Sequence, residues 1–461
     1  MTNEGAVVAG DGRLHDAAVR RWTAAGVAAA VAVFWMLGSL GRPWLLFAAS
    51  RRTTSDFFDL QASSLLQGRL TIPAGSLGIE EFVTPRGSHM YFGIFPAVLR
   101  LPFTAVFGNL DSRFGLFSCL LAVVVAGVAT ARLARRMQRQ MGLVDGPSPR
   151  WYAAIGAAPV LASPFLFLGS APVVYHEAIA WGAAAALWGV DAAMQWWFLR
   201  RGRDALWMLL AAAIAVSSRA SVGLLPLVMA TLLAVLLLAR RQFRPACVAG
   251  GVAAIAMLSY SIVDVARFRQ WWGAPAALQR AYDLVPEQQA AVALTDGSLF
   301  SVRFMPTTVV TYLDPVPMLR LTRLFPFVRP AGPIAPLGSA PMQVAPAGSI
   351  WWAAPVLVAL AAVGGWWIVR RGDTVWRVAA VAGLVTSVAT FGFWAVWHRY
   401  LVDFVPLLVI AAVPGFWVTW EWARSLGPGR RRSLVAVAVV VGVLAMAVQI
   451  GIGLWNRLIG F

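Results

Sequence analysis

The sequence predicts an all-α polytopic membrane protein with about eleven transmembrane helices. Two features of composition support this: hydrophobic residues make up 59% of the 461 residues and charged residues only 13%, and the mean hydropathy is +0.71. Soluble domains carry about 25% charged residues. The third feature is distribution, because apolar runs recur along nearly the whole chain. Together these observations favour one bundle of membrane helices over several soluble domains.

Eleven apolar runs are candidate spans, since a helix of about 20 apolar residues crosses the hydrocarbon core. The fifth run is short. Tryptophans crowd several ends of the runs, where amphipathic indole rings prefer the membrane interface. The runs are 22–48, 113–134, 151–169, 177–199, 205–217, 222–239, 246–263, 350–369, 375–397, 401–423 and 433–455.

The arginines predict the orientation. All 38 basic residues are arginine, and the formal net charge is +18. If the N-terminus is cytoplasmic, every cluster between spans except Arg51–Arg52 falls on the cytoplasmic side, as in the positive-inside pattern. We therefore expect a multi-pass protein of the plasma (inner) membrane that contacts membrane lipids, has its functional site outside and binds no nucleic acid. The clusters are Arg20–Arg21, 132–140, 200–203, 240–244, 370–373 and 430–432.

Two long segments on the predicted outer side divide the chain. We expect a cytoplasmic tail at 1–21, an N-terminal transmembrane module at 22–263 with its first outer loop at 49–112, an outer cap at 264–349, and a C-terminal transmembrane module at 350–461. In the first loop, "DFFDLQASSLL" has apolar residues at helical spacing, which predicts an amphipathic helix on the outer surface. "YFGIFPAVLRLPF" is too short to span and predicts a half-helix at the interface.

Asp56 and Asp59 open the first outer loop close to the membrane. A carboxylate in such a place is costly to desolvate, so it commonly has a partner or a task. The task would be that of a general base, which takes the proton from an acceptor hydroxyl. The alternative is a pair of solvated charges on one helix face, since residues three apart share a face. Position alone leaves both interpretations open.

The stretch "WHRYLVDF" places His398, Arg399, Tyr400 and Asp403 at a predicted outer membrane boundary. Arg399 presents paired N–H donors that match phosphate oxygens. Phosphate charge is stabilised strongly where water is excluded. The alternative is an Arg399–Asp403 ion pair at i,i+4 within one helix. Arg219 is a second phosphate candidate, because it stands alone at an outer helix end; snorkelling to the headgroups is its alternative.

His176 and Glu177 lie in the short outer turn "VVYHEAIAW". They are candidates for contact with a sugar or a metal, although Glu177 at a helix N-terminus is also favoured by the helix dipole. A divalent cation held by carboxylates is left open as a cofactor. Four further residues of the first loop are expected to be solvated, with contact to the substrate as the alternative: Glu80, Glu81, Arg86 and His89.

The order of elements at the start of the chain follows a known arrangement. A predicted first helix is followed at once by Asp56, then by an amphipathic segment ending in Gly68, by "YFGIFPAVLRLP", and by "VFGNLDSRF" before the second helix. Residues 30–135 resemble the N-terminal third of GT-C-type glycosyltransferases, polytopic enzymes that use polyprenyl-phosphate sugars, and look most like actinobacterial integral membrane proteins of this type. The resemblance gives Asp56 the place of the catalytic carboxylate and Tyr91 a place in an aromatic element, whereas Phe57 departs from a frequent second acid.

The resemblance implies an inverting glycosyltransferase with a GT-C-like fold. It would move a hexosyl or pentosyl group from a polyprenyl-phosphate donor to an extracytoplasmic cell-envelope acceptor, which would be a cell-wall glycan, a lipid or a protein. Asp56 would act as general base, and Arg399 with Arg219 would stabilise the departing phosphate. The other candidates for substrate contact are Asp59, Tyr91, His176, Glu177, His398 and Tyr400. The alternatives are a transporter or flippase of a phosphate-bearing lipid and a non-catalytic membrane protein.

Overall fold

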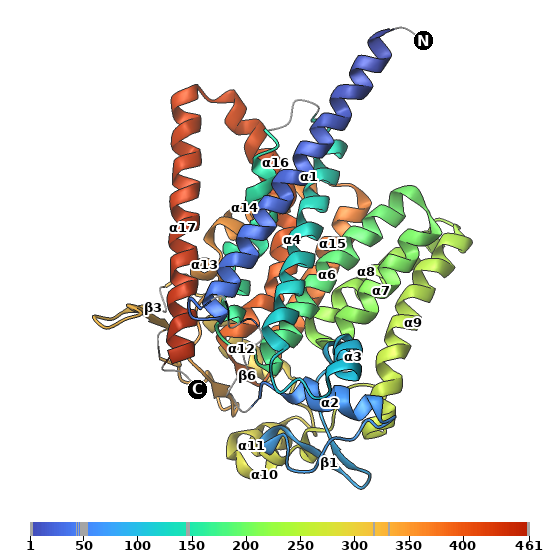
Figure 1. The fold of residues 1–461 in the computed structure, drawn as a ribbon, viewed down its shortest axis with the longest axis vertical. Coiled ribbons are helices and arrows are strands. Elements are labelled where there is room, and N and C mark those ends of the chain that lie inside the picture. The colour runs from blue at the N-terminus through green and yellow to red at the C-terminus, as the bar shows by residue number, and fades with distance from the viewer. Residues whose placement is uncertain are drawn as a thin grey trace.

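The computed structural model describes residues 3–42, 44, 46, 54–143, 148–316, 319–330 and 332–458, and long helices fill most of that length (Figure 1). All eleven predicted runs coincide with helical structure, although the end of the first run and Arg51–Arg52 lie outside the described residues. The helices at these runs are α1 (Asn3–Gly38), α4 (Gly115–Gln140), α5 (Trp151–Leu161) with η3 (Pro164–Ser170), α6 (Val174–Leu199), α7 (Gly202–Val216), α8 (Ala220–Ala239), α9 (Phe243–Phe268), α14 (Pro355–Arg371), α15 (Thr374–Phe391), η6 (His398–Phe404) with α16 (Val405–Ser425), and α17 (Pro428–Leu458).

Seven of the described helices are long and apolar enough to cross a membrane, or eight if the bent pair α5 and η3 forms one span. The other predicted spans lie on α6, α7 and α14. α7 and α14 have only 15 and 17 residues. α6 has 26 residues but is buried along most of its length, with Glu177 and Asp191 inside the protein, and a helix surrounded by protein does not need a lipid-compatible surface. The multi-pass membrane architecture is confirmed, and the number eleven stays a prediction.

Close helix crossings stabilise the bundle. α14 and α16 cross at Gly364 and Gly415. A Cβ on Gly364 would lie 1.8 Å from the carbonyl oxygen of Ala411, and one on Gly415 would lie 1.8 Å from that of Leu360. Small residues permit this approach of two backbones in membrane bundles. α5 and η3 meet at a bend of 61°, where Ser163 caps η3.

The two outer segments gather at the end of the bundle opposite the N-terminus (Figure 1). The first contains α2 (Phe57–Leu66), η2 (Gly78–Glu80), the antiparallel strands β1 (Phe82–Thr84) and β2 (Gly87–His89), and α3 (Phe95–Phe107). The second contains η4 (Ala276–Leu278), α10 (Arg280–Leu284), α11 (Pro286–Leu294), η5 (Val302–Phe304), α12 (Met305–Leu313), the antiparallel pair β3 (Leu319–Leu321) and β4 (Val328–Pro330), β5 (Gln343–Val344) and α13 (Ile350–Ala353).

α2 and α3 are the two helices predicted in the first outer loop, but α2 packs its apolar residues on protein. Phe57 and Phe58 join a small core with α3 and the start of α6, whereas Leu66 is 48% exposed. Asp59 and Gln61 are buried too. α2 is therefore embedded in the outer part of the protein and buries polar as well as apolar side chains.

The cap is hydrogen-bonded to the chain just before η6. β5 pairs in parallel with β6 (Ala395–Val396), and Phe300 forms an isolated bridge with Phe393. The backbone N–H of Ser301 donates to the carbonyl of Gly392 at 2.8 Å. These contacts fix the position of the residues that open η6.

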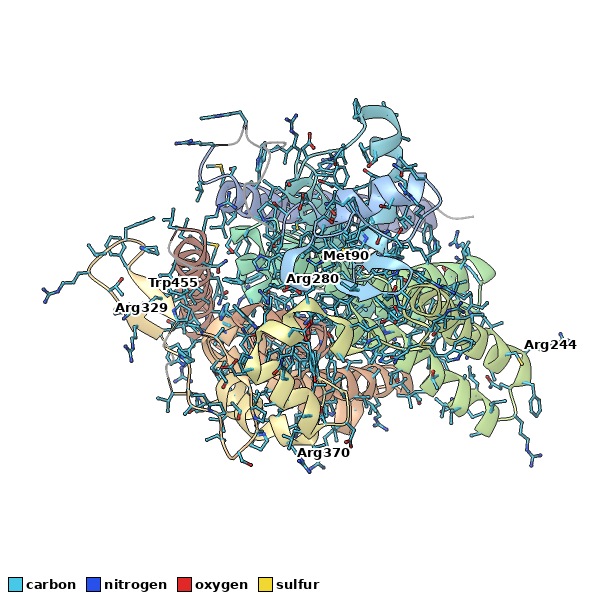
Figure 2. All side chains as sticks on the ribbon, turned by 90° about the horizontal axis from the view of Figure 1, so that it is seen from below. Met90, Arg244, Arg280, Arg329, Arg370 and Trp455 are labelled. Carbon is cyan, nitrogen blue, oxygen red and sulfur yellow. The ribbon has the colours of Figure 1, made fainter. Side chains whose placement is uncertain are left out.

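The cap is also joined to the first outer segment. Figure 2, seen from the outer end, shows Arg280 and Met90 near the middle of the molecule and Arg329 and Trp455 on one flank, where β4 packs on α17. Arg280 forms an ion pair of 3.2 Å with Glu81. Glu81 is fully buried, so the expectation that this charge is solvated is wrong, because folding places the cap over the loop.

Candidate active site

A cavity of about 1470 Å³ lies between the outer segments and the helix bundle. Its walls come from the first outer segment, the first turns of α6 and α8, the cap, η6 and the last turns of α17. Six of the nine predicted site residues line it: Tyr91, His176, Arg219, His398, Arg399 and Tyr400. The other three are not among its lining residues: Asp56, Asp59 and Glu177.

Arg399 is held in the cavity wall among aromatic rings. Its guanidinium carbon lies 4.2 Å from the centre of the Tyr175 ring, 4.4 Å from that of Trp397 and 5.3 Å from that of Tyr400. Such contacts hold a cation by the ring quadrupoles. Its Nε is buried without a hydrogen-bond partner, and none of the ion pairs in the described part of the chain includes Arg399. A guanidinium in this state is suited to bind an anion in the cavity.

Arg219, directly before α8, forms the ion pair with Asp403 that was the alternative interpretation of Arg399. Its Nε donates to Oδ1 of Asp403 at 2.9 Å, and its Nη2 donates to Oδ2 at 2.9 Å. The hydroxyl of Ser221 donates to the same carboxylate at 3.0 Å. The alternative of an Arg399–Asp403 pair is therefore wrong. Arg219 also lies 4.8 Å from the ring centre of Tyr400, so it supports the wall while its charge is already compensated.

His398 and His176 line the cavity, and hydrogen bonds to neighbouring segments hold both rings. The N–H of Gly348 donates to Nδ1 of His398 at 3.0 Å. The Nε2 of His398 therefore carries the proton and donates to Oε1 of Gln449 at 3.3 Å. The Nδ1 of His176 donates to the carbonyl of Leu168 at 3.0 Å. These bonds fix the orientation of both imidazole rings.

Glu80 lines the same cavity, whereas the sequence favoured a solvated charge at this position. The hydroxyl of Tyr175 donates to its Oε1, and Nε2 of Gln279 donates to its Oε2 at 3.0 Å. Burial raises the pKa of the Glu80 carboxyl above its ordinary value, and the hydrogen bond from Tyr175 and the charge of Arg399 offset this only in part. No sequence signal distinguishes Glu80 from Glu81. Glu80 faces the cavity and Glu81 is buried in the protein because each contacts a different residue of the cap, Gln279 and Arg280.

Tyr91 completes this part of the wall. Its ring centre lies 4.1 Å from that of Phe92 and 5.2 Å from that of Phe82. Burial raises the pKa of the Tyr91 hydroxyl well above its ordinary value, and the charge of Glu80 adds to this shift. The phenol is therefore a neutral hydrogen-bond donor at physiological pH.

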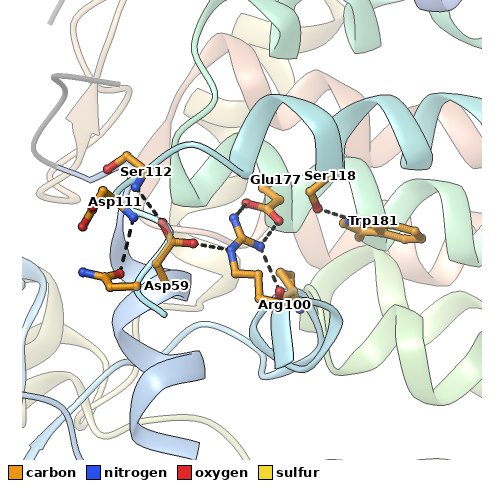
Figure 3. Close-up of polar contacts among 9 residues, drawn as sticks. Asp59, Arg100, Asp111, Ser112, Ser118, Glu177 and Trp181 are labelled. Atoms are coloured by element: carbon orange, nitrogen blue, oxygen red, sulfur yellow. Dashed lines mark hydrogen bonds and ion pairs between the residues drawn. The ribbon is translucent and has the colours of Figure 1, made fainter. Parts of the chain in front are cut away.

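Asp59 and Glu177 meet in a buried cluster around Arg100, which is drawn in Figure 3. Nε of Arg100 donates to Oδ1 of Asp59 at 2.6 Å, and its two Nη atoms donate to Glu177 at 2.5 and 2.8 Å. The second oxygen of Asp59 accepts from the N–H of Ser112 at 2.7 Å. The three charged side chains are at most 2% exposed. They join α2, α3 and α6, which favours the structural interpretation for both carboxylates.

Asp56 lies at the N-terminal end of α2, beside the cavity but outside its lining. Its carbonyl accepts from the N–H groups of Asp59 and Leu60, at 2.9 and 3.0 Å, and Thr54 lines the cavity two residues earlier. Burial raises the pKa of the Asp56 carboxyl, and the nearby charges of Asp59 and Asp111 raise it further. The role of Asp56 as general base stays a prediction.

A metal centre is not indicated by the described residues, among which no three His, Cys, Asp or Glu side chains converge as ligands. Mg²⁺ is commonly bound by one or two carboxylates together with substrate phosphates and waters. Without a cluster of three ligands among these residues, a divalent cation would need ligands from the substrate phosphate or from elsewhere. The cation therefore stays an unassigned prediction.

Sequence comparison and structure comparison differ in what they find. No protein-family model matches the chain, and no curated protein matches it in sequence. Among solved structures it is similar to the archaeal oligosaccharyltransferase AglB from Archaeoglobus fulgidus, in complex with an inhibitory peptide and a dolichol-phosphate, with a TM-score of 0.51 and 13% identity over 94% of this chain. The chain spans only 56% of the length of AglB. The chain has a GT-C-type fold.

A second similar structure is ArnT from Cupriavidus metallidurans bound to undecaprenyl phosphate, with a TM-score of 0.46 and 13% identity, covering 95% of this chain and 77% of ArnT. The GT-C-like fold expected from residues 30–135 therefore extends over most of the chain, and the match to AglB carries that conclusion. At this level of identity the likeness concerns the fold, and the site has to be judged from its own residues.

Proposed function

We propose that this protein is a glycosyltransferase that moves a sugar from a polyprenyl-phosphate donor to an extracytoplasmic acceptor of the cell envelope. The observation that carries the proposal is Arg399, a guanidinium with a buried, unpartnered Nε that faces a cavity of about 1470 Å³. A phosphate is the ligand whose oxygens match such a donor set. Dolichol-phosphate and undecaprenyl phosphate in the structures of AglB and ArnT support a lipid-linked donor.

The proposed reaction is an inverting transfer of a hexosyl or pentosyl group. Arg399 stabilises the charge that develops on the phosphate as the bond to the sugar breaks, and the neutral Tyr91 is placed to donate a hydrogen bond on the same wall. Arg219 acts by holding Asp403 and the Tyr400 ring in position. Fixed donors of this kind are effective because they need no reorganisation during the reaction.

The location of the cavity supports a site on the outer face of the plasma (inner) membrane. The arginine clusters at 132–140, 240–244 and 370–373 lie at helix ends away from the outer segments, so the positive-inside rule places the cavity outside. Nucleotide sugars are absent from such a compartment, whereas a lipid-linked donor is delivered through the bilayer. The acceptor would be a cell-wall glycan, a lipid or a protein.

The test is a transfer assay in detergent or liposomes with short-chain polyprenyl-phosphate sugars, together with a binding assay for undecaprenyl phosphate. Arg399→Gln should lose both binding and transfer, and Arg399→Lys should recover part of the binding, because lysine keeps the charge without the planar fork. Arg329→Gln, on the exposed hairpin of β3 and β4, is the matched control. Undecaprenyl phosphate binding that is the same in Arg399→Gln and in the wild type would refute the proposal.

A further inference from the structure

Glu80 is placed at the reacting end of the cavity by two independent attachments. It ends η2 in the first outer segment, and its carboxylate receives the Tyr175 hydroxyl from α6 and the Gln279 amide from the cap. Tyr175 is also the ring on which the Arg399 guanidinium rests at 4.2 Å. The carboxylate therefore contacts the hydroxyl of Tyr175 and the guanidinium contacts its ring, in one cavity wall.

The other carboxylates that line the cavity are not available as bases. Asp403 is neutralised by Arg219 at 2.9 Å, and Asp296 is exposed in a turn of the cap where its φ is 52°. Glu80 takes part in none of the ion pairs found in the described ranges. It is thus a half-buried carboxylate of the cavity that forms no ion pair and whose two oxygens are oriented by neutral donors.

We propose that Glu80, and not Asp56, accepts the proton of the acceptor hydroxyl during sugar transfer. The inference rests on the proposed glycosyltransferase function. The hydroxyl oxygen attacks the anomeric carbon and forms the new glycosidic bond. Its proton passes to the Glu80 carboxylate. The bond between the anomeric carbon and the phosphate oxygen breaks, and its electron pair leaves with the polyprenyl phosphate, which Arg399 holds. The proton later leaves Glu80 to water, which restores the carboxylate.

The surroundings of Glu80 suit this task. A general base works best when its pKa is near the working pH, and burial shifts the pKa of Glu80 upward from the ordinary 4.5. The groups that face it are Arg399, Tyr91, Tyr175 and Gln279. Tyr175 and Gln279 orient the carboxylate without adding charge, and the charge of Arg399 lowers the pKa of Glu80 and so favours its ionised form.

The first experiment compares three charge-removing variants in the transfer assay: Glu80→Gln, Asp56→Asn and, as the matched control in the same cavity, Asp296→Asn. Loss of a general base costs about 10² to 10⁴ in rate. We expect a loss of that order in kcat for Glu80→Gln, with undecaprenyl phosphate binding within about threefold of the wild type, and near wild-type kcat for the other two. Near wild-type kcat in Glu80→Gln would overturn the inference.

The second experiment separates a base from a structural group. Formate or acetate should restore part of the activity of Glu80→Ala, because a small carboxylate fits the space left and accepts the proton. The same salts should leave Asp56→Ala unchanged. Rescue of Asp56→Ala without rescue of Glu80→Ala would overturn the assignment.

The wild type offers a third test that needs no variant. Its kcat/KM should fall about tenfold per pH unit below the pKa of Glu80, and a flat profile down to pH 4.5 would contradict the inference. These outcomes are separable from failure of the proposed function, in which case the wild type would neither bind undecaprenyl phosphate nor transfer a sugar.

Discussion

Replacement of Arg100 by methionine should destabilise the outer part of the protein more than any other single change in the buried cluster. Arg100 compensates two carboxylates at once, Asp59 at 2.6 Å and Glu177 at 2.5 and 2.8 Å, and all three side chains are at most 2% exposed. Removing one member of a buried ion pair costs about 3–5 kcal/mol, because a charge is left without compensation. Arg100→Met leaves two such charges, so its cost should reach at least the upper end of that range.

The neutral variants should follow in a fixed order. Asp59→Asn should cost about 1.5–3 kcal/mol, the range for a hydrogen bond to a charged group, since Arg100 keeps both bonds to Glu177. Glu177→Gln removes the bidentate partner and should cost more. The apparent melting temperature in detergent, followed by tryptophan fluorescence, should therefore fall in the order Asp59→Asn, Glu177→Gln, Arg100→Met.

The triple variant Asp59→Leu, Arg100→Met, Glu177→Leu is the control for this reasoning. It removes every charge of the cluster, and replacing a whole buried ionic cluster by apolar side chains is often neutral or stabilising. It should therefore melt above Arg100→Met. The reasoning is refuted if Arg100→Met melts with the wild type, or if the triple variant is the least stable of the four.

Three further predictions concern the site and the bundle. Arg399→Lys should bind undecaprenyl phosphate about 10- to 100-fold more weakly than the wild type, since a hydrogen bond to a charged group is worth about 1.5–3 kcal/mol and each 1.4 kcal/mol is a factor of about ten. Equilibrium binding in detergent measures this, and equal affinity contradicts it. The pKa of Glu80 is higher in the folded than in the unfolded state. The protonated carboxyl therefore favours folding below the unfolded-state pKa, and this stabilisation is lost as the pH rises through the folded-state pKa. Glu80→Gln should therefore gain melting temperature relative to the wild type at pH 7 but not at pH 4, and an equal difference at both pH values argues against this. Gly364→Ala should destabilise the crossing of α14 and α16, because its Cβ would lie 1.8 Å from a carbonyl oxygen. Gly365→Ala has open space around it and should melt like the wild type. Equal melting temperatures of the two variants would contradict the close contact of α14 and α16 at Gly364.

The helices could be predicted from the sequence because each run of about 20 apolar residues is a local signal. The grouping of Arg399, Arg219, His176 and His398 at one end of the bundle could be predicted too, since the arginine clusters orient each helix. What failed was the choice of partners. Asp403 is four residues from Arg399 in sequence, yet it pairs with Arg219 across 184 residues.

The same limit explains the carboxylates. Asp59 and Glu177 had the same sequence signal as Asp56, a charge beside the membrane, but the partner that buries them is Arg100, 41 and 77 residues away. Glu80 is oriented by Tyr175 and Gln279, which are 95 and 199 residues distant. Local sequence patterns indicate that a charged residue lies near the membrane boundary. Whether that residue faces a cavity depends on the packing of segments distant in sequence.

The attachment of the cap to the strand before η6 has a consequence for engineering. β5 belongs to the cap, and Arg399 is the third residue after β6, while Gln279 of the same cap orients Glu80. Chimaeras that exchange residues 264–349 alone would replace half of a hydrogen-bonded unit and misplace the side chains of Arg399 and Glu80. A graft intended to alter acceptor choice has to carry 393–404 and the loop around η2 with it.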